Sequence, residues 1–90
     1  MHISIQSLEI TYNAVPYRFI VKQVANTSRN EISFHCWAPD DSRPAKELMN
    51  SSVLMFEWDH HNDVLVSEAE SPLVNTLKEA IRQTFMMERA

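Results

Sequence analysis

The chain of 90 residues contains no glycine. Glycine is the residue that adopts positive φ most readily and that lets the backbone come closest to a ligand. Without it, the sequence has no Gly-rich phosphate-binding loop, no G-x-G-x-x-G dinucleotide turn and no G-x-S-x-G nucleophile elbow. This one feature excludes the nucleotide-binding and hydrolytic classes that depend on those motifs.

Length and charge narrow the remaining classes. A chain of this size is expected to form a single domain, residues 1–90. Hydrophobic residues make up 44% and charged residues 22%, as in ordinary globular proteins. The chain is acidic, with 12 Asp and Glu against 8 Lys and Arg and a net charge of −4. Binding to nucleic acid relies on clustered Lys and Arg, so we expect no nucleic-acid partner.

The sequence predicts a cytoplasmic protein that does not enter a membrane. Cys36 is the single cysteine, so it cannot form a disulfide within the chain, and nothing favours an oxidising compartment. The first residues lack the basic and apolar regions of a signal peptide. No apolar run approaches the roughly 18 residues that a membrane-spanning helix needs.

Apolar residues that recur with a period of two predict a sheet. Five segments are expected to be strands, at about 2–12, 17–24, 31–37, 52–58 and 64–67. The clearest alternation is in 31–37, where Ile32, Phe34 and Cys36 alternate with more polar neighbours. The segment 52–58 is apolar on both faces, and 64–67 is a short strand expected to pair back onto it. A turn over residues 13–16, which contains Asn13 and Pro16, separates the first two segments.

The first of these segments changes parity. Ile3 and Ile5 occupy odd positions, whereas Leu8 and Ile10 occupy even ones. Side chains on one face of a strand must keep the same parity, so we expect an extra residue near positions 6–7 in the form of a β-bulge. A break into two short strands is the alternative.

A helix is expected at about 72–88. Ser71 is a favoured N-cap residue, and Pro72 suits the first helical position. Leu77, Ile81 and Phe85 then share one side at helical spacing, which is typical of a helix that lies on a sheet. Residues 44–49 could form a turn or two of a second helix. The sequence therefore predicts an α+β fold: an antiparallel sheet of four or five strands with one C-terminal amphipathic helix packed on one face.

The sheet face away from this helix is the first candidate site. The alternation assigns to it the apolar residues Ile20, Val24, Trp37, Val53 and Met55. A contiguous apolar patch of this size on a surface usually marks association, and symmetric homodimers are the commonest oligomers. The first hypothesis is a small non-catalytic interaction module whose partner is itself or another protein. The alternatives are an error in strand parity or a 38–50 segment that folds over the patch.

The second candidate is a metal site at the polar segment 57–63. His60 and His61 would be ligands, and Asp59 or Asp63 would complete the shell, with Glu57 nearby. Imidazole and carboxylate groups suit a divalent metal such as zinc, which could activate a water for hydrolysis. The spacing matches no established motif, and an ordinary polar turn explains the same residues. Apart from this alternative, the sequence predicts no cofactor.

No catalytic residue is assigned. Cys36 and His35 are neighbours on a predicted strand and so point to opposite faces, which prevents a nucleophile–base pair between them. The alternation places Cys36 in the core, where cysteine behaves as a small apolar residue. His35 would strengthen the metal hypothesis only if it reached the 57–63 turn.

Overall fold

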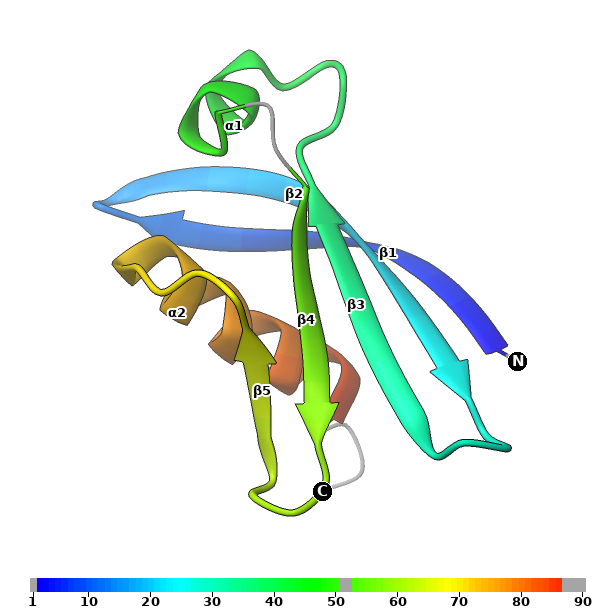
Figure 1. Cartoon of the computed structure of the whole chain (residues 1–90). Coiled ribbons are helices and arrows are strands. Elements are labelled where there is room, and N and C mark those ends of the chain that lie inside the picture. The colour runs from blue at the N-terminus through cyan, green and yellow to red at the C-terminus, as the bar shows by residue number, and fades with distance from the viewer. Residues whose placement is uncertain (1, 51–52, 87–90) are drawn as a thin grey trace.

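The computed structural model describes residues 2–50 and 53–86, which form a five-stranded antiparallel sheet with a helix across one face (Figure 1). The expected α+β fold is confirmed. Consecutive strands are neighbours, in the order β1-β2-β3-β4-β5. The elements are β1 (His2–Tyr12), β2 (Val15–Asn26), β3 (Glu31–Trp37), α1 (Arg43–Leu48), β4 (Leu54–Asp59), β5 (Val64–Ser67), α2 (Pro72–Ile81) and the π-helical η1 (Arg82–Met86).

The element bounds differ from the sequence expectation mainly at the ends. β2 begins two residues before the expected position 17 and continues two residues beyond 24. Position 52 of the expected fourth strand and positions 87–88 of the expected helix lie outside the described residues. The helical segment expected at 44–49 is observed as α1.

The turns of this glycine-free chain rely on asparagine, aspartate and alanine. Among the described residues, positive φ occurs at Asn13, Ala14, Asn30, Asn50 and Asp63. Asn and Asp tolerate this region better than other residues with a Cβ atom. Ala14, with φ of 65°, has no such advantage and carries local strain.

The β1–β2 turn is tighter than expected. Tyr12 pairs directly with Val15, so the loop consists of Asn13 and Ala14 alone. Positive φ at both residues defines a type I′ turn, whose twist matches that of the flanking strands. Pro16 lies within β2, opposite Thr11, on a stretch of β2 that β3 does not reach.

The predicted bulge in β1 is wrong. β1 pairs with β2 in one unbroken register from His2↔Ala25 to Tyr12↔Val15, so no residue is inserted and the strand is not divided. The change of parity has a different cause. Leu8 and Ile10 lie in the core, whereas Ile3 and Ile5 lie on the other face and are exposed.

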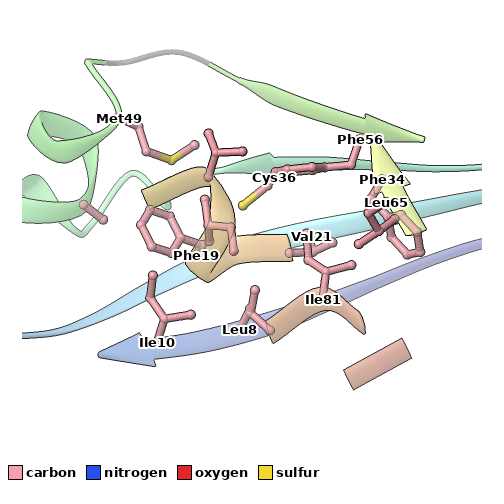
Figure 2. Close-up of a cluster of buried hydrophobic side chains, with 13 residues drawn as sticks. Leu8, Ile10, Phe19, Val21, Phe34, Cys36, Met49, Phe56, Leu65 and Ile81 are labelled. Atoms are coloured by element: carbon pink, nitrogen blue, oxygen red, sulfur yellow. The ribbon is translucent and has the colours of Figure 1, made fainter. Parts of the chain in front are cut away.

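The sheet face under α2 contains the core. Phe19, Phe34 and Phe56 come from three adjacent strands and are completely buried. Val74, Leu77 and Ile81 of α2 pack on this face, which we call the covered face (Figure 2). The helix is fixed at its start because the backbone N–H of Val74 donates a hydrogen bond to Ser71 Oγ at 3.1 Å.

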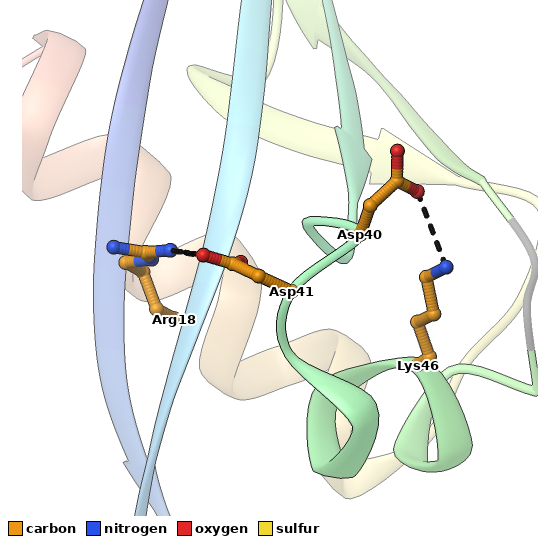
Figure 3. Close-up of polar contacts among 4 residues, drawn as sticks. All are labelled: Arg18, Asp40, Asp41 and Lys46. Atoms are coloured by element: carbon orange, nitrogen blue, oxygen red, sulfur yellow. Dashed lines mark hydrogen bonds and ion pairs between the residues drawn. The ribbon is translucent and has the colours of Figure 1, made fainter.

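The segment between β3 and β4 closes one end of the covered face. Ala45 of α1 and the adjacent Met49 are buried in the same apolar cluster as the strand residues. The preceding loop is held by two ion pairs, Arg18 with Asp41 and Lys46 with Asp40, each at 3.1 Å (Figure 3). One alternative drawn from the sequence has this segment fold over the opposite face, but the residues that it buries belong to the core.

Candidate functional site

The sheet face opposite α2 is a continuous surface formed by all five strands, which we call the open face. Paired residues share a face, and the register joins Ile3, Val24, Ser33, Glu57 and Val66 in one row across the sheet. The next rows along the strands contain Ile5, Lys22, His35 and Met55, and then Ser7, Ile20 and Trp37. Val64, opposite Asp59, and Val53, just before β4, complete its apolar members.

The open face retains a large exposed apolar surface. Six aliphatic side chains belong to it and are between 40% and 61% exposed: Ile3, Ile5, Val53, Met55, Val64 and Val66. Only Val15, in the β1–β2 hairpin, is a further large exposed hydrophobic residue among those described. Exposed apolar side chains therefore concentrate on one surface, whereas scattered single residues are normal for a monomer.

All five predicted interface residues occur at this surface. Ile20 is directly opposite Trp37, and both are half-buried, as is Val24. Met55 and Val53 are well exposed. No part of α1 reaches over them, because its buried residues join the core on the covered face.

Sequence reasoning missed four members of the open face. The expected bulge would turn Ile3 and Ile5 toward the core, whereas the unbroken pairing with β2 leaves them on the opposite face and exposed. Val64 and Val66 were treated only as a short pairing strand, yet they alternate with the buried Leu65. Neither pattern decides the face by itself: the parity change in β1 fits a bulge equally well, and residues 64–66 are apolar at every position, so the pairing of the strands assigns these residues.

Two opposite charges lie in the central rows of the open face, and Glu9, Arg18, Glu31 and Asp59 lie toward its ends. Lys22 is on β2 beside His35, and Glu57 is on β4 between Ser33 and Val66. Within the described parts of the chain, neither Lys22 nor Glu57 forms an ion pair or a side-chain hydrogen bond. Their charges are thus available to groups from outside the chain.

A hollow of about 410 Å³ indents the margin of this surface where β5 ends at Ser67, opposite Phe56, so that the first residues of β4 have no β5 partner. Val53, Met55, Glu57 and Val66 contribute to its lining. It is large enough to receive an apolar side chain from a partner.

The polar segment 59–63 forms a self-contained turn. The carboxylate of Asp59 accepts hydrogen bonds from the Nδ2 atom of Asn62 at 2.8 Å and from the backbone N–H groups of His61 and Asn62 at 2.9 and 3.3 Å. The hydrogen bond from the Asn62 side chain is the main cause that lowers the pKa of Asp59, followed by that from the Asn62 backbone. Asp59 therefore shapes the turn with oxygens that the metal hypothesis assigns to a cation.

The other predicted ligands do not converge. His60 lies edge-on to the ring of Trp58, at 6.4 Å between centroids. Asp63 is engaged by Arg82, whose guanidinium donates a hydrogen bond to the Asp63 carbonyl at 3.0 Å and lies 3.6 Å from its carboxylate. His35 is opposite Met55, four residues and about 13 Å along the strand from Asp59.

This geometry gives the metal hypothesis no support. Across residues 2–50 and 53–86, no three His, Cys, Asp or Glu side chains are grouped so that they could hold a metal ion.

Cys36 is a core residue with an unreactive thiol. It is completely buried on the covered face, opposite Val21 and Leu54. Burial raises the pKa of Cys36 from its ordinary value of 9.0 to about 12, because the thiolate would lose its hydration. At neutral pH the group is an uncharged thiol, which argues against a nucleophilic role.

Two further findings bear on function. Within the described portion of the chain, none of the helices combines the length and apolar character needed to cross a membrane. Comparison of the chain with models of protein families, with curated proteins and with solved structures found no match to any of the three.

Proposed function

We propose that this chain is a small non-catalytic association module that binds a second copy of itself through the open face. The observation that carries the proposal is the concentration of six exposed aliphatic side chains on this one surface. Stacking two open faces would remove these side chains from water, and completing the burial of one half-exposed aliphatic side chain is worth about 1 kcal/mol. Two sheets pack in this way in β-sandwiches.

The charges on the open face favour a second copy as the partner. A two-fold axis makes a contact self-complementary, so a rotation that places Lys22 against Glu57 of the second copy also places Glu57 against Lys22 of that copy. Both charges then gain a partner that they lack within the described chain. A face with one sign of charge would instead repel its own copy.

Sedimentation at micromolar concentration tests the apolar part of the contact. We expect the wild-type chain to associate and Met55→Lys to weaken the face contact by about 100-fold, because the two-fold axis places the change in both copies. Met55 is exposed in the single chain, so the substitution should leave the melting temperature of dilute protein nearly unchanged. A wild-type chain that remains strictly monomeric contradicts the proposal.

A charge exchange tests whether the partner is a second copy. Lys22→Glu alone and Glu57→Lys alone each place like charges opposite one another in the face contact and should weaken it. The double variant Lys22→Glu/Glu57→Lys restores opposite charges across the two-fold axis and should recover association. If the double variant associates no better than the single variants, Lys22 and Glu57 do not face each other in the assembly.

A further inference from the structure

Strand β1 forms an edge of the sheet that lacks the usual protection against pairing. Natural edge strands are kept apart by short length, lysine, proline or a bulge. β1 has 11 residues, pairs with β2 without a bulge, and contains no proline, lysine or arginine. The opposite edge, β5, has only four residues. The two edges therefore differ sharply in their capacity to accept another strand.

The amphipathic pattern of the first half of β1 does not fit the chain's own core. Ile3 and Ile5 lie on the open face and are 56% and 61% exposed. His2, Ser4 and Gln6 face the side on which α2 packs, where apolar residues begin only at Leu8. The segment 2–6 thus presents isoleucines that no helix or loop of the described chain covers.

We propose that residues 2–6 of β1 pair antiparallel with the same residues of a second copy, around a two-fold axis at Ser4. This register places Ile3 opposite Ile5 of the second copy, and Ile5 opposite Ile3 of that copy. Four isoleucines then form one cluster on the open-face side of the joined sheets, and Ser4 faces its own copy on the other side. Apolar cross-strand pairs of this kind stabilise a sheet.

Other symmetric registers match the strand less well. A register centred on Ile5 keeps a single Ile–Ile pair and sets Ile3 opposite Ser7. A register centred on Ser7 sets Ile5 opposite the carboxylate of Glu9 and Ile3 opposite Thr11. The register at Ser4 keeps both apolar pairs and includes no residue that carries a formal charge at neutral pH.

This edge contact is separate from the face contact proposed above. Edge pairing extends the sheet sideways and leaves both open faces uncovered. A chain with both contacts assembles beyond a dimer, and loss of one contact leaves the other.

Disulfide trapping tests the register. Residues directly opposite in an antiparallel pair have Cα atoms about 4.5–5.5 Å apart, within the range that a disulfide spans. Ser4→Cys should therefore form a covalent dimer under mild oxidation. The matched control, Ser7→Cys, lies on the same edge, but its two copies would be about 20 Å apart in this register. Cys36 is buried and does not contribute.

The outcomes separate the two proposals. In the Met55→Lys background, where the face contact is weakened, we expect Ser4→Cys to give covalent dimer on a non-reducing gel and Ser7→Cys to stay monomeric. Trapping through Ser7→Cys in that background, or no trapping through Ser4→Cys, overturns the edge pairing and leaves the face contact untouched.

A charge substitution provides a second measurement. In the Met55→Lys background, which weakens the face contact, Ile5→Lys should weaken the remaining edge dimer at least tenfold, since it replaces one member of each Ile–Ile pair with a cation. Thr11→Lys is the matched control, because it is exposed on the same face of the same strand but lies outside residues 2–6. Equal dimerisation of the two variants contradicts the proposal.

Discussion

The two faces of this sheet are formed by the same strands, yet the apolar side chains of one are buried and those of the other are exposed. On the covered face, Phe34 and Phe56 are fully buried beneath α2. On the open face, Met55, next to Phe56 in the chain, is 58% exposed. β4 presents apolar side chains to both sides of the sheet, and α2 can cover only one of them. Apolar character identifies surfaces that gain from burial, and the tertiary structure decides which of them the chain covers itself.

The largest expected effect compares neighbouring residues of β4. Phe56→Ala removes a ring from the core and should lower the free energy of unfolding by about 3–5 kcal/mol. Met55→Ala should change the free energy of unfolding by no more than about 0.5 kcal/mol in dilute protein, because its side chain is mostly in water. Urea unfolding measures both, and Phe56→Leu serves as the milder substitution if Phe56→Ala does not fold. Similar losses at the two positions would contradict the assignment of the faces.

A second comparison uses the burial of Cys36. Because the pKa of Cys36 is raised to about 12 in the folded chain, only the unfolded chain ionises this thiol between pH 9 and pH 12. The contribution of Cys36 to stability is thus complete below pH 9 and is lost as the pH rises, by about 1.4 kcal/mol per pH unit.

Unfolding of the wild-type chain and of Cys36→Ala between pH 8 and pH 10.5 isolates this effect, since the variant lacks the thiol. Native Cys36 should also resist alkylation at pH 8 and react readily in urea. Rapid alkylation of the folded chain would show that the covered face is open at this position.

The smallest expected effect on stability is at the β1–β2 turn, which belongs to neither face. It gives a reference value against which the effects on the two faces can be compared. Ala14 has φ of 65° in the two-residue β1–β2 turn. Glycine adopts this conformation without the clash of a Cβ atom, and Asn-Gly is the preferred type I′ pair. Ala14→Gly should therefore raise the free energy of unfolding by about 0.5–1 kcal/mol, net of the greater freedom of glycine in the unfolded chain. A decrease in thermal stability would contradict the turn geometry.

Much of the fold follows from local patterns. The period of two in β3 and the capping pair Ser71–Pro72 predicted their elements directly, since each depends on neighbouring residues. The missing bulge in β1 shows where local patterns fail. A parity change looks the same whether a residue is inserted or apolar residues point outward, and only the pairing with β2 distinguishes the two.

The candidate sites follow the same division. The sequence singled out Trp37 and Met55 because alternation alone places them opposite the core. It could not choose between a metal site and a turn at 59–63, because that choice depends on where side chains converge in space. In the structure, the Asp59 carboxylate accepts hydrogen bonds from the turn backbone, and Asp63 forms an ion pair with Arg82, which is distant in the sequence.

By itself, the sequence determined the strands, the final helix and the presence of apolar residues on two sides of the sheet, because periodicity and capping act over a few residues. Only the tertiary structure decided that α1 and α2 both pack on the covered face. It also decided that β1 runs unbroken along an edge of the sheet and that Ile3 and Ile5 remain exposed to water. These outcomes depend on which surfaces meet when the chain closes on itself, and a chain with one long helix cannot cover both sides of its sheet.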